Sequence, residues 1–285
     1  MSVLEQRQFG KWKISLISAG QVKMDGGAIF GVVPKPLWEQ RLQADERNRV
    51  TLAMNCLVAQ NEEECVLIET GFGGKVNPKM RDHYGLDEEP GLVASLSKIG
   101  VDVEDVTRVV VTHLHQDHAG GCTIKGTDGF EPAFPNATYY IQEGEWVDGE
   151  QADGQTVNGY RLQEVMHPLQ NKNCVVFLKG DAKICSGVRG ILTPGHTRCH
   201  QSVLVETGED IICYTGDLIP TTNHLRPIYI LAYDLYPRET FLNKQALMNQ
   251  AYLENWILVW SHDKDMPWGR LDRNEKGDYF PVSIK

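Results

Sequence analysis

One short segment constrains this chain more than any other, because four potential metal ligands follow an apolar run within six residues. Residues 109–112 read Val-Val-Val-Thr, and His113, His115, Asp117 and His118 come after them. In a chain with nine histidines this pattern arises by chance on the order of once in two thousand sequences. The alternative is a set of surface histidines that cap a helix, but a solvated turn does not need three imidazoles. We therefore predict a metal site at the end of a buried strand.

Three more apolar runs end close to a residue of the same kind. Their candidate ligands are His196, Asp217 and His262. Because functional side chains gather beyond the carboxyl ends of strands, we expect all four strand ends to converge on one site. Five histidines and two aspartates are too many for one tetrahedral ion, and a shared carboxylate can bridge two cations. The sequence predicts two divalent metal ions, with zinc, iron, cobalt and manganese all suited to these ligands.

Composition narrows the class of protein further. The chain has 285 residues, of which 41% are hydrophobic and 23% charged, so it can bury a core and does not resemble a disordered protein. Its formal net charge of −10 argues against a nucleic-acid partner, since phosphates attract a positive surface. The seven cysteines are odd in number and have no Cys-x-x-Cys spacing, which indicates buried free thiols rather than disulfides.

The apolar runs are short. Residues 211–214 and 256–260 fall far below the roughly 20 residues that cross a bilayer, so no membrane partner is expected. The apolar stretch at 14–19 is also too short for the core of a signal peptide. We accordingly expect a cytoplasmic protein.

Strand and helix patterns alternate along the whole chain. Runs rich in β-branched residues predict strands, polar turns at 60–64 and 206–210 predict antiparallel hairpins, and three segments have helical spacing. The predicted strands are 12–18, 50–59, 65–68, 108–112, 138–141, 174–178, 190–193, 202–205, 211–215 and 256–260, and the predicted helices are 36–47, 91–99 and 238–254. No linker or repeat divides the sequence, so we predict a single α/β (α+β) domain over residues 1–285.

The ligand motifs carry a family resemblance. His-x-His-x-Asp-His, a Thr-Pro-Gly-His-Thr turn at His196, Thr-Gly-Asp at Asp217 and a histidine after a strand at His262 resemble the metallo-β-lactamase superfamily. The resemblance implies a four-layer αβ/βα sandwich with its site at one edge of two facing sheets. It implies a first metal on His113, His115 and His196, a second on Asp117, His118 and His262, and a bridging Asp217.

The spacing of the motifs resembles one branch of that family. His196 and Asp217 are 21 residues apart and Asp217 and His262 are 45 apart, intervals similar to those of quorum-quenching N-acyl-homoserine lactonases. Segments 25–35 and 216–222 also resemble bacterial lactonases. The resemblance implies hydrolysis of a small lactone or ester, zinc as the first choice of metal, and a homodimer.

Two positions depart from the lactonase pattern. Better-characterised lactonases place a tyrosine three residues after the bridging aspartate, where it orients the substrate, whereas this chain has Pro220. His224, Tyr229 and Tyr233 are candidates for that role, and packing in a loop is the alternative for each. The family's Asp-Thr-Gly is replaced by Glu-Thr-Gly, and we expect Glu69 to support a metal-binding histidine through a hydrogen bond.

Several other residues are candidates by their place in the sequence. His200 is expected to lie near the site, with a structural turn as the equal alternative. Phe30 and Met24 could line an acyl pocket or a dimer contact, and Trp268, which closely follows His262, could form another pocket wall. Cys122 is expected to be a packed residue rather than a nucleophile, because no dedicated base accompanies it.

The predicted chemistry is attack on an ester carbonyl by a hydroxide that bridges two metals. Metal coordination lowers the pKa of water toward neutrality, and Asp117 would pass a proton to the leaving alkoxide as general acid. The same site could hydrolyse organophosphate triesters or aryl esters. A further alternative is a metal-binding sensor without turnover, against which the presence of all seven ligands argues.

Overall fold

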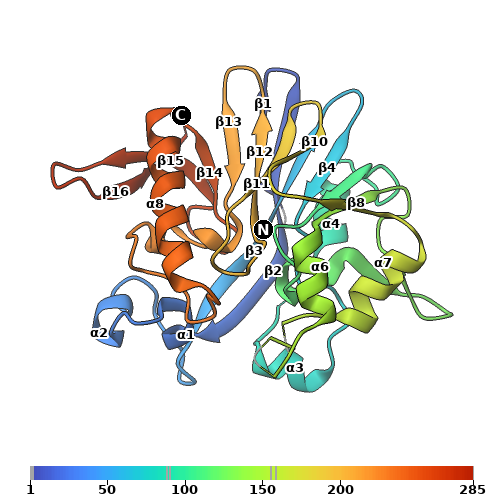
Figure 1. Ribbon diagram of the computed structural model, residues 1–285, viewed down its shortest axis with the longest axis horizontal. Helices are drawn as coiled ribbons and strands as arrows, with labels where there is room; N and C mark the ends of the chain where they lie inside the picture. Colours follow the sequence, from blue (N-terminus) through green and yellow to red (C-terminus); the bar gives the residue numbers. More distant parts are fainter. Residues whose placement is uncertain (1–2, 88, 90, 155, 158, 285) are drawn as a thin grey trace.

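The computed structural model describes residues 3–87, 89, 91–154, 156–157 and 159–284, and two seven-stranded sheets dominate it (Figure 1). In spatial order, the first sheet contains β1 (Val3–Phe9), β2 (Trp12–Asp25), β3 (Arg49–Gln60), β4 (Cys65–Ile68), β5 (Arg108–Val110), β8 (Thr138–Gln142) and β9 (Val175–Leu178). The second contains β10 (Ala182–Cys185), β11 (Val188–Leu192), β12 (Gln201–Glu206), β13 (Ile211–Tyr214), β14 (Ile257–Val259), β15 (Trp268–Arg273) and β16 (Tyr279–Val282). A small ribbon pairs β6 (Thr123–Lys125) with β7 (Phe130–Pro132).

Helices cover the outer faces of both sheets (Figure 1). The α-helices are α1 (Gly26–Phe30), α2 (Lys35–Trp38), α3 (Pro78–His83), α4 (Leu92–Lys98), α5 (Gln116–Ala119), α6 (Glu143–Glu150), α7 (His167–Asn171) and α8 (Pro237–Leu253). Four single turns of other helix types are η1 (Gly120–Cys122), η2 (Leu162–Met166), η3 (Gly216–Leu218) and η4 (Thr222–His224). In Figure 1 the long α8 lies outside the second sheet, and α4 and α6 lie on the opposite side of the molecule.

Three apolar clusters hold these layers together. Between the sheets, side chains such as Leu16 and Leu57 of the first sheet pack in the same cluster as Val203 and Val259 of the second. Alternation along a strand sends the intervening residues to the outer faces. One outer cluster lies under α4 and the other lies under α8, which contributes Met248. The result is the predicted order of helix, sheet, sheet and helix, and the αβ/βα sandwich is confirmed.

All ten predicted strands are present, as are both hairpins. The sequence reading missed β1, β6, β7, β10, β15 and β16, which are short, lie near sheet edges or carry many polar residues. Among the described residues, no helix is long and apolar enough to span a membrane.

The helix predicted over 36–47 is wrong beyond its first turn. The structure ends α2 at Trp38, and the chain continues as turns. The side chain of Asp45 accepts hydrogen bonds from the backbone N–H groups of Arg47 and Arg49, both at 2.9 Å. Such local bonds compete with helical ones, which is why aspartate favours turns.

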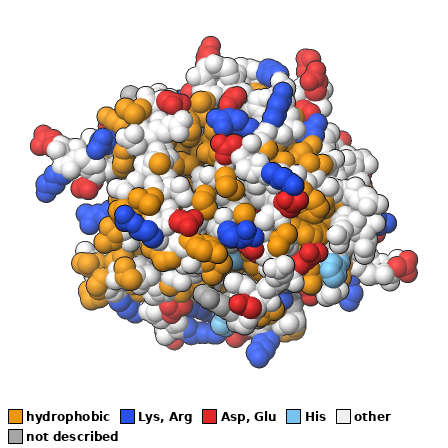
Figure 2. Space-filling view, viewed as in Figure 1, with side chains coloured by type: hydrophobic (Ala, Val, Ile, Leu, Met, Phe, Trp, Pro, Cys, Tyr) orange, Lys and Arg blue, Asp and Glu red, His pale blue; other side chains and the backbone are white. Residues whose placement is uncertain are grey.

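Exposed charges are mixed in sign. Acidic and basic side chains are interspersed over the face in Figure 2, between patches of apolar side chains. The expectation that this acidic chain does not bind nucleic acid stays a prediction, as do the single domain, the homodimer and the cytoplasmic location.

Candidate metal centre

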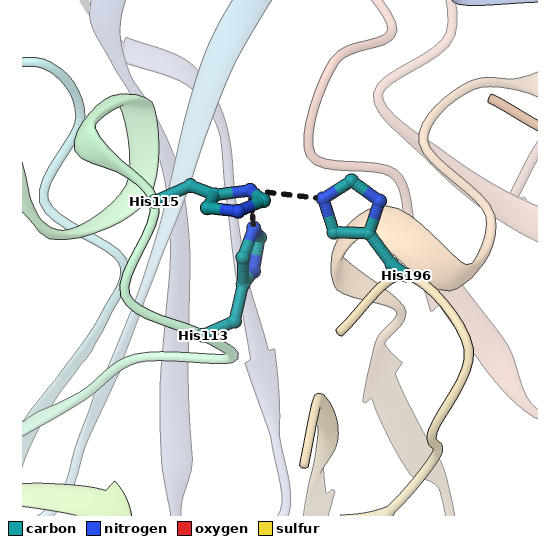
Figure 3. A group of neighbouring side chains, drawn as sticks. All are labelled: His113, His115 and His196. Carbon is teal, nitrogen blue, oxygen red and sulfur yellow. Dashed lines mark hydrogen bonds between the residues drawn. The ribbon is translucent and has the colours of Figure 1, made fainter. Parts of the chain in front are cut away.

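The seven candidate ligands lie beyond the carboxyl ends of four strands. In the second sheet, β12 is antiparallel to β11 and β13, and β13 is parallel to β14. The strands β11, β13 and β14 therefore run in the same direction and end at the same edge. The loop after β5 of the first sheet brings His113 and His115 to face His196 from the second (Figure 3).

The first group of ligands consists of three imidazoles. Nδ1 of His115 lies 3.0 Å from Nε2 of His113 and 3.0 Å from Nε2 of His196 (Figure 3). One nitrogen of each ring lies within 4.8 Å of the others. Three nitrogens that converge in this way can share one cation, as the resemblance implied.

The second group contains two imidazoles and a carboxylate. Nε2 of His118 and Nε2 of His262 are 3.3 Å apart, and Oδ2 of Asp117 lies 3.7 Å from each of them. These atoms also lie within 4.8 Å of one another. The geometry brings together the residues expected for a second cation.

Asp217 lies between the two groups. Its Oδ1 is 3.2 Å from Nε2 of His118 and 3.2 Å from Nε2 of His262, whereas its Oδ2 is 3.4 Å from Nε2 of His196. One carboxylate oxygen thus faces each group. A carboxylate in this position can bridge two cations.

Hydrogen bonds fix which nitrogen of each ring points inward. Nδ1 of His196 donates to Oδ1 of Asp234 at 2.8 Å, and Nδ1 of His262 donates to the carbonyl of Ala53 at 2.7 Å. Nδ1 of His118 donates to Oε2 of Glu69 at 3.1 Å. Because Nδ1 of each ring makes this outward bond, each Nε2 faces the cluster, where it can bind a cation when the cation displaces its proton. The donor set therefore fits divalent cations.

Glu69 supports a metal-binding histidine, as expected, and its side chain also accepts a second hydrogen bond. Its Oε2 accepts from His118, and its Oε1 accepts from the backbone N–H of Thr112 at 2.6 Å. The residue has a positive φ of 68° and a side chain only 2% exposed. The longer acid thus connects the strand before the motif to a ligand inside it.

His200 lies behind Asp217 instead of in the cavity. Its Nε2 accepts from the backbone N–H of Asp217 at 3.1 Å, and its Nδ1 is 3.2 Å from the carbonyl of Thr193. Burial lowers its pKa to about 3, so the ring is neutral. At Gly216, where φ is +55°, a Cβ atom would lie 2.5 Å from Nε2 of His200. Both residues therefore hold the backbone that presents Asp217.

The electrostatics of the cluster favour cations. Burial by itself would lower the pKa of His118, but the carboxylates of Asp217 and Asp117 outweigh it and raise that pKa well above its usual value. Burial opposes ionisation of Asp217, yet the imidazoles, His118 first, hold its pKa well below the usual range. Burial and the neighbouring His196 lower the pKa of His115 to about 3. The carboxylates of Asp117 and Asp217 therefore favour the binding of positive charge in the cluster, and the neutral imidazole of His115 has a nitrogen that can bind a cation.

Two buried acids at this site escaped the sequence analysis. Asp234 supports His196, but it lies in a loop with no strand end or motif to mark it. Glu145 of α6 accepts from the backbone N–H of Leu114 at 3.2 Å and from the hydroxyl of Thr197. Glu145 therefore connects the two loops that carry the first group of ligands. Its position depends on the tertiary fold, so no local sequence signal marks it.

A cavity of about 320 Å³ opens onto the metal cluster. Its polar lining includes ligands of both groups, and its apolar lining comes from β2, β3, α1 and the loop before α8. The apolar side chains are Met24, Ile29, Leu52, Leu231 and Leu235. Met24 therefore lies where an acyl pocket was expected.

The remaining predicted pocket residues differ in their positions. His224 and Tyr233 line the cavity. Phe30 is fully buried behind its wall, with its ring stacked 5.0 Å from that of His224, and Tyr229 packs edge-on against Phe30. Phe30 and Tyr229 therefore lie behind the residues that line the cavity. On α1, it is Ile29 and not Phe30 that lines the cavity.

Trp268 is not a pocket residue. Its indole nitrogen donates to Glu5 at 2.6 Å, and its ring packs edge-on against Phe9 of β1. As part of β15 it lies in the core between the sheets. Cys122 is also in the core, and burial raises the pKa of its thiol to about 12, in keeping with a packed residue. The chain's seven cysteines are free thiols, five of them buried.

Comparisons with known proteins agree with this architecture. An N-acyl homoserine lactonase from Bacillus cereus is 29% identical over 176 residues, which cover 56% of this chain and 61% of that relative. The chain thus matches less than two thirds of the relative's length.

Solved structures match over almost the whole chain. A probable metal-dependent hydrolase from Staphylococcus aureus superposes with a TM-score of 0.88 at 27% identity, covering 98% of this chain and 100% of the other. The dizinc quorum-quenching lactonase AidC superposes with a TM-score of 0.81 at 20% identity, covering 100% and 99%, and shares the fold. The family model of the metallo-beta-lactamase superfamily matches residues 51–262, which include all seven candidate ligands. By this match over most of its length, the chain belongs to the metallo-beta-lactamase superfamily.

Proposed function

We propose that this protein is a metal-dependent hydrolase that opens the ring of N-acyl-homoserine lactones. The observation that carries the proposal is the position of Asp217, whose two oxygens face the two ligand groups where the cavity meets them. A site for two cations next to a partly apolar cavity suits a substrate with a reactive ester at one end and an acyl chain at the other.

The lining of the cavity is consistent with such a substrate. Apolar side chains, among them Met24 and Leu52, offer contacts for a hydrocarbon chain. The ligands His115, Asp117 and His262 line the same cavity, so an ester would reach them while its chain lies against the wall. A neutral lactone carries no charge that this wall would have to accommodate.

The chain's residues divide the chemistry between them. Divalent cations held by the two groups would supply a water of lowered pKa and polarise a carbonyl oxygen. Asp117 lines the cavity beside the second group, so its carboxyl can carry a proton to the alkoxide that leaves when the ring opens. Glu69, Asp234 and the Ala53 carbonyl hold the imidazoles in orientation throughout.

The lactonase name of the Bacillus cereus relative supports this choice of substrate. We infer zinc as the preferred metal, because the fold is shared with a lactonase described as dizinc and because imidazole and carboxylate ligands suit zinc.

The test is hydrolysis by purified, zinc-loaded protein. Acid release at constant pH would be followed with butanoyl-, hexanoyl- and decanoyl-homoserine lactones, alongside paraoxon and 4-nitrophenyl acetate. We expect kcat/KM to be highest for a lactone. No lactone turnover would reject the lactonase assignment, and a higher kcat/KM for paraoxon would assign the site to phosphotriesters. Less than about one metal per chain after gentle purification, measured by elemental analysis before any zinc is added, would favour the sensor alternative.

A further inference from the structure

Two residues that line the cavity, Pro220 and His224, cannot donate a hydrogen bond to a substrate oxygen. Pro220 has no hydrogen-bond donor, and both nitrogens of His224 are occupied. Nε2 of His224 donates to the carbonyl of Ile29 at 2.9 Å, and its Nδ1 is 2.8 Å from the hydroxyl of Thr221. Burial lowers the pKa of His224 to about 3, so the ring is neutral and Nδ1 accepts the hydrogen of Thr221. His224 therefore lines the cavity but has no hydrogen left to donate to a substrate.

Tyr84 brings a phenol to the same cavity from another part of the chain. It follows α3 directly, is half-buried, and lines the cavity with Gln116 and Asp117. Its ring packs against Phe72, with the ring centres 5.3 Å apart. Its backbone N–H donates to the carbonyl of Met80 at 2.9 Å. Both contacts restrict the position of the ring.

Gln116, which lines the same cavity, is held in place by Arg161. The side chain of Arg161 donates to Oε1 of Gln116 from two nitrogens, and the Nε contact measures 2.8 Å. Because the guanidinium has only donors, the oxygen of Gln116 must face it and the NH₂ group must point the other way. Burial raises the pKa of the Tyr84 phenol, so it keeps its hydrogen at neutral pH.

A protonated phenol in the lining of the cavity has a hydrogen to donate. We propose that Tyr84 donates this hydrogen to an oxygen of the bound ester and orients it toward Asp117 and the metal cluster. The role rests on the proposed hydrolysis. From the position directly after α3, Tyr84 supplies the contact that Pro220 cannot make.

Tyr233 is the other phenol at this cavity, and its position is less constrained. It lies in the loop before α8 with 47% of its surface exposed. Water competes with the substrate for such a group. We therefore assign the orienting contact to Tyr84.

The experiment compares Tyr84→Phe with Tyr233→Phe and with Tyr252→Phe, a half-buried tyrosine of α8 that packs against Tyr279 away from the cavity. Loss of one hydrogen bond to substrate is expected to lower kcat/KM of Tyr84→Phe about ten-fold. Because the contact is to the ester, the loss should be the same for butanoyl-, hexanoyl- and decanoyl-homoserine lactones. Tyr252→Phe should leave kcat/KM unchanged.

A purely structural role for Tyr84 would give a different pattern. The proposal expects the Tm and the metal content of Tyr84→Phe to equal those of the parent protein. Unchanged kcat/KM in Tyr84→Phe, a larger loss in Tyr233→Phe, or a loss that accompanies a lowered Tm or metal content would overturn it. Absence of lactone turnover in the parent protein would instead reject the proposed function, so the two failures are distinguishable.

Discussion

His196 donates its Nδ1 hydrogen to Oδ1 of Asp234 over 2.8 Å, and the other oxygen of Asp234 is buried with no hydrogen-bond partner among the described residues. A buried carboxylate with an unsatisfied oxygen is costly unless positive charge lies nearby. Asp234 lies near two groups that can carry positive charge, His196 and Lys244, and its effect on His196 can be tested.

Asp234→Asn should weaken metal binding. The amide keeps the shape of the side chain but removes the negative charge that makes His196 more basic. Loss of such an outer contact typically lowers metal affinity about 10- to 100-fold. The measurement is zinc affinity by competition with a chromogenic chelator. Asp272→Asn, an exposed aspartate of β15, is the matched control, and equal affinities for the two variants would contradict the prediction.

Asp217→Asn should remove the ligand that the two metal-binding groups share. An amide presents one oxygen and one NH₂ group, so it cannot accept from both sides as the carboxylate can. We expect elemental analysis to fall from about two metal ions per chain to about one or fewer, and activity to fall with it. A variant that retains two ions would show that Asp217 does not bridge. The Tm should be measured in parallel, because Asp217 is buried.

Much of this centre could be predicted from the sequence because its signals are local. The motif at 113–118 is contiguous, and His196, Asp217 and His262 each follow an apolar run that forms a strand. Strand direction then brings the ligands together.

Glu69 was marked by its motif, but two other supporting residues could not be found in this way. Asp234 and Glu145 contact residues 38 and 52 positions away in the sequence, and neither carries a periodic or motif signal. Trp268 shows the converse error, since it is near His262 in sequence but its ring is turned into the core between the sheets. Proximity along the chain places a residue on a loop or strand, but only packing decides which way its side chain points.

Lys244 should make stability depend on pH. This residue of α8 is fully buried, its ammonium donates to the carbonyl of Tyr229, and burial lowers its pKa from 10.5 to about 7. Between these two pH values the unfolded chain binds more protons than the folded one, so this residue's contribution to the free energy of unfolding rises with pH. From pH 7 to pH 9 the rise amounts to about 2 kcal/mol.

The measurement is urea unfolding of the parent and of Lys244→Met at both pH values. Buried cysteines have raised pKa values and act in the opposite direction near pH 9, so the difference between parent and variant isolates the lysine. Lys244→Met also leaves the Tyr229 carbonyl without its donor, a loss of about 1–3 kcal/mol that does not change with pH. A parent-minus-variant difference that is the same at pH 7 and pH 9 would refute a titrating Lys244.

Met24→Ala should change the preference for acyl chain length. Met24 contributes to the apolar wall of the cavity, and each methylene that the wall buries is worth about 0.8 kcal/mol, or roughly four-fold in affinity. If the acyl chain lies along this wall, kcat/KM for decanoyl-homoserine lactone should fall several-fold while that for the acetyl compound changes little, because the acetyl group is too short to reach the lost side chain. Leu253→Ala, a 71% exposed position on α8, is the control. An equal loss for short and long chains would place the acyl group elsewhere in the cavity.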